Sequence, residues 1–289
     1  MPLESLSRLM QKAQEQKYAV GYFESWSLES LQGVIDAAEQ TRSPIIIGFN
    51  GEFLSRRRGA LEADLTLYAA LGKAAALQCA VPCAFIFNEC SRDSWVERAI
   101  HSGFNIVMLA DPEATPEDYK RRVARLTTMA HSRGVAVEAE IDELPCGDHG
   151  GAESDPQVAA DFIQATGVDL LAVSVGNEHI KLQGRSPLNL ERLESIHERV
   201  QIPLVLHGGT GVADDSLKSA IRLGVRKVNY GTYIKQRYLQ AIPKALSQAL
   251  NPHALLGDGS ETDTMVLGRQ IVRDAVLERI ELLGCCGRA

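Results

Sequence analysis

The sequence predicts an α/β fold, a closed (β/α)8 barrel (TIM barrel) with an additional C-terminal helix, from three observations. Eight short apolar runs alternate with longer amphipathic segments along the 289 residues. The runs are nearly continuous rather than alternating, which is typical of parallel strands covered on both faces. Eight strand–helix units in a chain of this length predict a closed barrel. In chain order the runs span residues 18–23, 44–49, 82–87, 104–109, 135–141, 169–175, 203–207 and 226–230.

The segments between the runs carry helix signals. Residues 27–40 have the apolar spacing of an amphipathic helix. Residues 115–134 begin with Thr115 as N-cap, Pro116 at the first helical position and acids in the first turn. Residues 264–284 predict a long helix after the last strand, placed to cover the barrel or a partner subunit.

An open doubly wound sheet is the alternative architecture. It would need fewer strands, and a glycine fingerprint usually follows its first strand. Here residues 23–30, at the end of the first predicted strand, contain no glycine. The closed barrel is therefore the favoured prediction.

Composition and charge limit the classes of partner. The net charge is −7 and the isoelectric point is about 5.6. Nucleic acid and anionic membranes both require a basic face, so neither is expected as the main partner. No window has the roughly 18 consecutive apolar residues of a membrane-spanning helix. The amphipathic N-terminal segment carries acids and does not resemble a signal peptide.

The six cysteines lack the spacing of a zinc finger. Three of them surround one predicted strand, and Cys285 and Cys286 are adjacent near the end of the chain. In an acidic chain of this size the pattern indicates reduced thiols and a cytoplasmic location.

Polar side chains collect where the predicted strands end. Asn88 and Glu89 end the third strand, Glu138 and Glu140 lie in the fifth, and His207 ends the seventh. His179 follows the sixth strand by four residues. Barrel enzymes carry their active groups at these carboxyl ends. Two imidazoles and one or two carboxylates at this end of the barrel predict a divalent metal site. The simpler interpretation of each histidine taken alone is a hydrogen-bonded structural residue.

Two glycine-rich loops follow the seventh and eighth strands. Glycines let backbone N–H groups approach an anion closely, and a helix that starts after such a loop directs its positive end at the anion. Both loops also contain a threonine whose hydroxyl can donate. The pattern predicts a phosphate site, and the simpler alternative is that the glycines only make tight turns. The residues concerned are Gly208, Gly209, Thr210, Asn229, Gly231 and Thr232.

Several segments in order resemble the class II, metal-dependent fructose-bisphosphate and tagatose-bisphosphate aldolases. They are VEAEI, GVDLLAVSVGNEH, IPLVLHGGTGV, VRKVNYGT and ERIELLGCCGRA. The resemblance covers nearly the whole chain and implies one barrel domain over residues 1–289. It also implies a lyase in which Zn²⁺ polarises a ketose carbonyl and stabilises an enediolate.

The resemblance implies roles for particular residues. Carried over, His179 and His207 are metal ligands, as is Glu140, and the two glycine loops bind phosphate. By the same resemblance the protein is a homo-oligomer, a dimer or tetramer, acting in carbohydrate metabolism.

The chain departs from the family at the catalytic positions. After the third strand the family has Asp-His, where Asp moves the proton of the C4 hydroxyl and His binds metal. Here Asn88 and Glu89 stand there, and Asn88 cannot act as an acid or base. In the loop after the fifth strand, Asp148 or His149 is a candidate to replace the missing acid, with a solvated glycine-rich loop as the alternative.

Further departures lie around the predicted mouth. Glu24 replaces an Asn of the family, the loop of residues 48–53 replaces a Gln/Ser pattern, and Ile180 replaces a phosphate-binding Gly. An Asp that follows the fourth strand in the family appears as Ala110, with Asp111 next to it. These changes argue against the usual bisphosphate as substrate.

Three functions remain open from the sequence. The first is a divergent metal-dependent aldolase for a phosphorylated ketose or related hydroxy-ketone, with Glu89, His179 and His207 holding the metal, joined by Glu140. That donor set admits Mn²⁺, Fe²⁺ or Co²⁺ beside Zn²⁺. An alternative within this first function is that Glu89 acts as the catalytic base instead of binding the metal. The second is a non-catalytic sugar-phosphate-binding subunit or regulator. The third is an isomerase or epimerase working through an enediolate.

Overall fold

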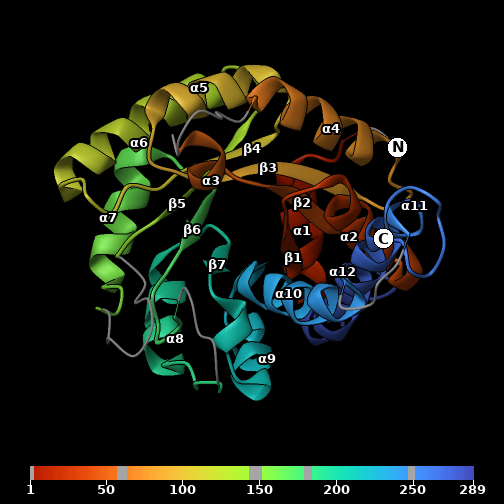
Figure 1. Ribbon diagram of the computed structural model, residues 1–289. Helices are drawn as coiled ribbons and strands as arrows, with labels where there is room; N and C mark the ends of the chain where they lie inside the picture. Colours follow the sequence, from red (N-terminus) through yellow and green to blue (C-terminus); the bar gives the residue numbers. More distant parts are fainter. Residues whose placement is uncertain (1–2, 57–63, 143–151, 179–183, 247–250) are drawn as a thin grey trace.

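The structure is a computed structural model that describes residues 3–56, 64–142, 152–178, 184–246 and 251–289. Its centre is a closed barrel in which each strand pairs in parallel with the next and β8 pairs with β1. The predicted barrel is confirmed (Figure 1). The strands are β1 Val20–Ser25, β2 Ile45–Asn50, β3 Cys83–Cys90, β4 Ile106–Leu109, β5 Ala136–Glu140, β6 Leu170–Ala172, β7 Leu204–Leu206 and β8 Val225–Tyr230.

Helices surround the barrel (Figure 1). Two of the segments analysed for helix signals form α2 and α6, and the long C-terminal helix is α12. In chain order they are α1 Leu6–Gln16, α2 Leu28–Thr41, α3 Gly51–Ser55, α4 Leu65–Gln78, α5 Asp93–Ser102, α6 Pro116–His131, α7 Pro156–Thr166, α8 Leu190–Arg199, α9 Asp214–Arg222, α10 Thr232–Leu246, α11 Pro252–Leu255 and α12 Thr264–Ile280, with short 3-10 turns η1 Gly209–Gly211 and η2 Glu281–Leu283.

Local chemistry explains these elements. The side chain of Thr115 accepts from the N–H of Asp118 and Pro116 opens α6, as predicted from the sequence. All six residues of β2 are buried, which accounts for its continuous apolar run. β6 and β7 have three residues each, so the predicted runs around them extend into the loops at the barrel mouth.

The additional helix α12 packs against α2 and α10 (Figure 1). Gly33 makes the close approach possible, because a Cβ there would lie 2.5 Å from the carbonyl oxygen of Arg269. Arg269 then forms a two-pronged ion pair with Asp36 of α2, at 2.5 and 2.7 Å. The helix therefore covers the outside of the barrel within this chain.

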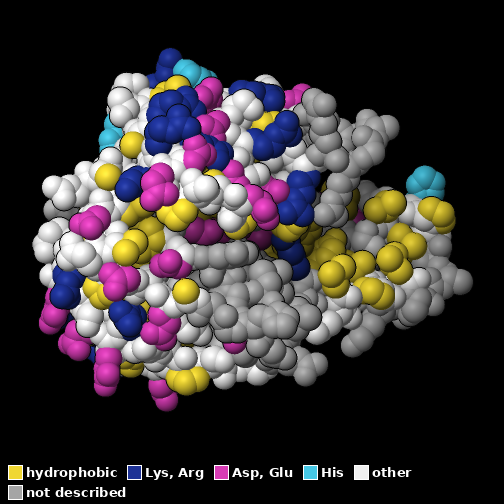
Figure 2. All heavy atoms as spheres, turned by 90° about the vertical axis from the view of Figure 1, so that its left-hand side faces the viewer, with side chains coloured by type: hydrophobic (Ala, Val, Ile, Leu, Met, Phe, Trp, Pro, Cys, Tyr) yellow, Lys and Arg dark blue, Asp and Glu magenta, His cyan; other side chains and the backbone are white. Residues whose placement is uncertain are grey.

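The surface beside α6 and α7 carries charges of both signs. Acidic and basic side chains are interspersed across the described part of this face, which Figure 2 shows. No helix among the described residues is long and apolar enough to cross a membrane. The five cysteines that the structure describes, Cys79, Cys83, Cys90, Cys285 and Cys286, are free thiols.

Candidate active site at the carboxyl end of the barrel

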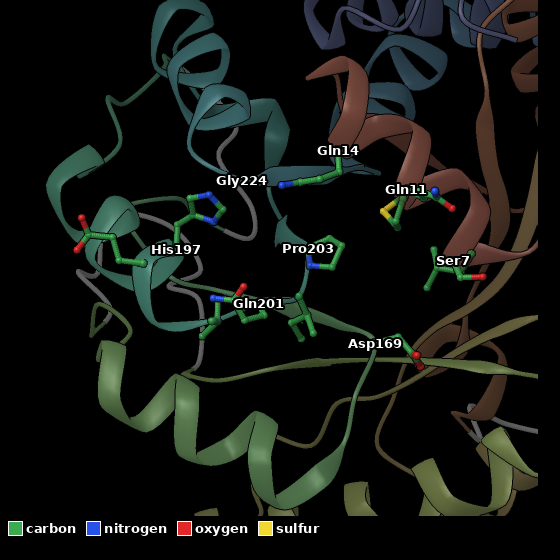
Figure 3. A pocket seen from close by; sticks show the side chains of 13 residues that line it. Ser7, Gln11, Gln14, Asp169, His197, Gln201, Pro203 and Gly224 are labelled. Atoms are coloured by element: carbon green, nitrogen blue, oxygen red, sulfur yellow. The ribbon is translucent and has the colours of Figure 1, made fainter.

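One cavity lies at the amino end of the barrel. It has a volume of about 720 Å³ and is lined by α1, the end of α8 and the segments before β6 and β7. Ser7 and Gln14 of α1 lie across from His197 and Pro203 (Figure 3). Barrel enzymes work at the opposite end, and this cavity holds none of the predicted site residues.

Another cavity, which we call the mouth pocket, lies at the carboxyl ends of the strands and has a volume of about 300 Å³. It is lined by residues at the ends of β1, β2, β3 and β8 and in the loops that follow β2, β7 and β8. Eight of the predicted site residues line it: Asn88, Glu89, His207, Gly208, Thr210, Asn229, Gly231 and Thr232. We therefore take the mouth pocket as the candidate active site.

A local backbone irregularity turns both Asn88 and Glu89 into this pocket. Successive side chains of a regular strand point to opposite faces. Glu89 has a positive φ of 51°, and the pairing of β3 with β4 shifts register between Phe87 and Cys90. This bulge lets neighbouring residues line one pocket. A non-glycine residue in the left-handed region is strained, and such strain concentrates at functional sites.

The Glu89 carboxylate is held in place from β2. Asn50, the last residue of β2, donates from Nδ2 to Glu89 Oε2 at 2.9 Å. The same side chain caps α3 by accepting from the N–H of Phe53 through Oδ1. Asn50 thus fixes both the Glu89 carboxylate and the start of the next helix.

His207 is the centre of the polar cluster. It directly follows β7, is 1% exposed, and its Nε2 lies 2.9 Å from Glu138 Oε1. Its Nδ1 lies 3.2 Å from Glu140 Oε2 and 3.4 Å from Glu89 Oε1. The backbone oxygen of His207 accepts from Asn177 Nδ2 at 3.1 Å. Three of the four predicted metal ligands therefore meet at one imidazole.

The surrounding carboxylates control the charge of His207. Burial lowers the pKa of a histidine, but hydrogen bonds to Glu138 and Glu140 and the charges of Glu140 and Glu89 outweigh it and raise the pKa of His207 to about 10. The imidazole is therefore a cation at neutral pH in the absence of a metal.

Beneath His207 lies a buried ion pair between β5 and β8. Glu138 and Lys227 have fully buried side chains, and Lys227 Nζ lies 2.7 Å from Glu138 Oε2. Burial would raise the pKa of Glu138, but Lys227 and His207 outweigh it and lower that pKa. Lys227 also donates to Asn229 Oδ1 at 2.6 Å. The pair therefore supports both His207 and the Asn229 side chain.

The donor set fits a divalent cation in part. With Glu138 accepting from Nε2–H, the other ring nitrogen of His207 faces Glu89 and Glu140. A carboxylate that orients a metal-binding histidine in this way is a common arrangement. Ligand atoms about 2.0–2.2 Å from a tetrahedral zinc lie about 3.3 Å apart. The distances of 3.2 and 3.4 Å around Nδ1 equal two edges of such a site, and without a metal they place a hydrogen bond from the protonated imidazole to Glu140.

The described part of the chain does not by itself complete a metal site. It comprises residues 3–56, 64–142, 152–178, 184–246 and 251–289. Within them no group of three or more His, Cys, Asp and Glu side chains is arranged to hold an ion. The fourth predicted ligand, His179, lies outside the described residues, as do Ile180, Asp148 and His149.

The glycine turns are close-packed. Gly208 has a positive φ of 64°, and a Cβ at Gly209 would lie 2.6 Å from a methyl of Val228. Thr210 accepts from the N–H of Tyr233 in the first turn of α10, at 3.2 Å. The turns therefore need glycine for conformation and packing, and they place Thr210 at the start of α10.

Two buried amides in the mouth pocket present unused polar atoms. Asn88 is 2% exposed and Asn229 is 7% exposed. Asn88 Oδ1 and Asn229 Nδ2 have no hydrogen-bond partner among the described residues. Buried amide atoms in proteins are nearly always paired. An acceptor and a donor thus line the pocket in positions suited to a bound ligand.

Sequence reasoning missed the residues that support the site. The sequence patterns do not identify Lys227 or Asn50 as site residues, and they identify Glu138 only as an acid near the end of a strand. A lysine in the middle of a fully buried strand was a usable signal, because a buried ammonium needs an acidic partner. Asn50 gave no comparable signal, since its role depends on the bulge at Glu89.

Comparisons with known proteins agree with this architecture. Residues 4–288 match the family model described as fructose-bisphosphate aldolase class-II. The chain is 30% identical over 302 residues to a probable fructose-bisphosphate aldolase of Bacillus subtilis, covering 100% of both chains. It is 30% identical over 297 residues to the fructose-bisphosphate aldolase of Geobacillus stearothermophilus, covering 100% of this chain and 99% of the relative.

A solved structure gives the same result. The crystal structure of the YdjI aldolase from Escherichia coli K12 superimposes with a TM-score of 0.84 at 29% identity, covering 99% of each chain. On this fold the present chain places a histidine between two carboxylates at the carboxyl end of the barrel. The chain belongs to the class II fructose-bisphosphate aldolase family.

Proposed function

We propose that the protein is a divergent metal-dependent aldolase that cleaves or forms a carbon–carbon bond in a phosphorylated ketose or a related hydroxy-ketone. The observation that supports this most strongly is His207, whose Nε2 is held by Glu138 while Nδ1 lies beside Glu89 and Glu140. A divalent cation, with Zn²⁺ favoured and Mn²⁺, Fe²⁺ or Co²⁺ as alternatives, would polarise the substrate carbonyl there.

The chain's own residues have distinct roles in this proposal. His207, Glu140 and Glu89 would hold the cation, with His179 completing the set. The Asn229 amide donates to the substrate, and the turns with Gly208, Gly209, Thr210, Gly231 and Thr232 bind its phosphate through backbone N–H and hydroxyl groups.

Proton transfer at the C4 hydroxyl cannot use Asn88, which has no titratable group. Asn88 Oδ1 instead accepts from a substrate hydroxyl and orients it. Asp148 or His149 moves the proton, or Glu89 does so while the cation is held by fewer ligands. Comparing Asp148→Asn, His149→Ala and Glu89→Gln in pH–rate profiles separates these assignments.

A panel of phosphorylated ketoses with added Zn²⁺, Mn²⁺ or Co²⁺ tests the proposal by aldehyde release. Cleavage that depends on the metal supports it, and absence of both metal binding and cleavage removes it. The double change Asn88→Asp with Glu89→His restores the family pattern and is expected to raise fructose-bisphosphate cleavage above the wild-type level.

The second candidate is a non-catalytic subunit or regulator that binds a sugar phosphate. Asn88 in place of the catalytic Asp favours it. Stoichiometric metal together with turnover argues against this candidate, whereas tight sugar-phosphate binding without turnover supports it. For either candidate function we propose that the protein is a homo-oligomer. Analytical ultracentrifugation measures the number of subunits.

A further inference from the structure

A buried tyrosine whose hydroxyl is not used within the described part of the protein lines the mouth pocket. Tyr22 belongs to β1, lines the pocket and is 2% exposed. Its hydroxyl oxygen is buried and has no hydrogen-bond partner among the described residues. Buried tyrosine hydroxyls usually have a partner, because an unpaired polar atom in the interior is costly. Tyr22 therefore presents an unused polar group in the wall of the candidate active site.

Strand pairing sets the direction of this side chain. In the register of β1 with β8, Tyr22 pairs with Asn229, which also lines the pocket. Glu24 lines it too, and residues two positions apart in a strand point to the same face. Lys227 Nζ lies 5.1 Å from the centre of the Tyr22 ring. The phenol therefore points into the barrel, on the same side as the Asn229 amide and the Lys227 ammonium.

The surroundings of Tyr22 keep the phenol protonated. Burial and the negative charges of Glu24, Glu89 and Glu138 raise the pKa of Tyr22 well above its usual value. The hydroxyl is therefore a hydrogen-bond donor at neutral pH. Surroundings that disfavour a phenolate also disfavour a negative charge on a ligand atom at the same place. The acceptor that fits best is a neutral carbonyl or hydroxyl oxygen.

Two other buried tyrosines provide a comparison. Tyr18 and Tyr230 are 1% and 0% exposed, and their hydroxyls also have no hydrogen-bond partner among the described residues. Neither of them lines the mouth pocket. Of these three tyrosines, Tyr22 alone places its unused group where a ligand of the candidate active site binds.

Tyr22 lies deeper in the barrel than the phosphate-binding turns of the proposed function. It is within β1 and pairs with a residue within β8, whereas the glycine turns follow the ends of β7 and β8. Two further neutral atoms without partners among the described residues, Asn88 Oδ1 and Asn229 Nδ2, line the same pocket. An acceptor, a donor and a phenol together match a carbon chain that carries carbonyl and hydroxyl groups.

We propose that Tyr22 is a substrate-binding residue whose hydroxyl donates a hydrogen bond to a neutral carbonyl or hydroxyl oxygen on the carbon chain of the ligand. The phosphate of the ligand stays at the glycine turns, and Tyr22 recognises the part that enters the barrel beyond it. This inference deepens the proposed function and rests on it in calling the ligand a phosphorylated ketose.

The first test is the stability of the protein without ligand or metal, measured by urea unfolding. Tyr22→Phe removes the hydroxyl and keeps the ring, and Tyr18→Phe makes the same change outside the pocket. Because a buried hydroxyl without a partner is costly, both variants should unfold at the same urea concentration as the wild type or at a higher one. A lower midpoint in Tyr22→Phe would show that the hydroxyl is bonded within the protein, and the proposal would fall.

The second test compares two ligands by calorimetry on the full-length protein in the presence of Zn²⁺. Dihydroxyacetone phosphate is a small phosphorylated ketose, and inorganic phosphate lacks the carbon chain. Tyr22→Phe should weaken binding of dihydroxyacetone phosphate about tenfold, because an oxygen of the ligand is left without its donor. Binding of inorganic phosphate should change by less than about twofold. Tyr18→Phe should bind both ligands as the wild type does.

The outcomes for Tyr22 are separable from those of the proposed function, which depends on metal-dependent aldehyde release. Unchanged binding of dihydroxyacetone phosphate in Tyr22→Phe, equal weakening of both ligands, or no binding of dihydroxyacetone phosphate by the wild type overturns the role of Tyr22, even if ketoses are cleaved. A selective tenfold loss without any cleavage by the wild type keeps that role and removes the aldolase proposal.

Discussion

Two clusters of charged side chains lie near the carboxyl end of the barrel, one outside it and one within. The outer cluster joins α5 and α6, where Arg122 lies 2.6 Å from both Asp93 and Asp111 and Arg125 contacts Asp93 and Glu97. Its side chains are 17–47% exposed. The inner cluster around His207 and the Glu138–Lys227 pair is 0–21% exposed.

The difference lies in what stabilises the carboxylates. In the outer cluster the carboxylates are partly exposed to solvent and are paired with arginine side chains. These ion pairs therefore contribute little to the free energy of unfolding. In the inner cluster three carboxylates share one ammonium and one imidazole with little water. Such a cluster is costly for folding and attracts a further cation. Burial, rather than the number of ion pairs, therefore distinguishes the candidate site from the outer cluster.

The largest expected effect comes from removing the inner imidazole. His207→Ala should lower kcat/KM for metal-dependent cleavage at least about a thousandfold, or about 4 kcal/mol of transition-state stabilisation. Arg125→Ala, in the outer cluster, is the matched control and should leave kcat/KM within about twofold. Equal losses in the two variants would contradict the contrast between the clusters.

The next effect concerns stability. Lys227→Met leaves Glu138 with His207 alone and should lower the free energy of unfolding by about 3–5 kcal/mol. Arg125→Met should lower it by no more than about 1 kcal/mol. Urea unfolding measures both, and the double variant Glu138→Gln with Lys227→Met should recover part of the loss. A Lys227→Met protein as stable as the wild type would show that the buried pair carries no such penalty.

A smaller effect depends on pH and comes from Asp93. Burial would raise its pKa, but Arg122 and Arg125 outweigh it and lower the pKa below the usual value. A carboxyl with a lowered pKa stabilises the fold above its unfolded pKa of about 4, and this contribution is lost as pH falls through the folded pKa. Asp93→Asn should therefore cost about 1 kcal/mol at pH 7 and much less near pH 2. A pH-independent difference in unfolding free energy would contradict this.

The smallest effect is expected at Glu97. Its carboxylate pairs with Arg125 at 2.6 Å, and the two side chains are 34% and 47% exposed. Glu97→Gln should change the unfolding free energy by no more than about 0.5 kcal/mol. A loss of several kcal/mol would mean that the outer cluster behaves like a buried one.

Much of the fold was predictable because it rests on local patterns. Continuous apolar runs marked all eight strands, and Thr115 with Pro116 marked the start of α6. The position of His207 at the end of a strand also followed from its run. These features depend on neighbours in the sequence, and barrel topology then brings the strand ends together.

The supporting contacts of the site were not predictable in the same way. Glu138 and Lys227 are 89 residues apart and meet only because the barrel closes. The positive φ of Glu89 breaks the strand periodicity that sequence reasoning uses. Asn50 contacts Glu89 only because of that turn. Closure and backbone strain are global properties, which local patterns do not contain.

Titration of metal-free protein with Co²⁺, followed by visible absorption, measures directly whether a metal binds at His207. We expect one ion to bind to each chain with the intense absorption bands of a four-coordinate site, and we expect this binding to be lost in His207→Ala but not in Arg125→Ala. Failure of the wild type to bind a stoichiometric ion, or an unchanged spectrum in His207→Ala, would contradict it.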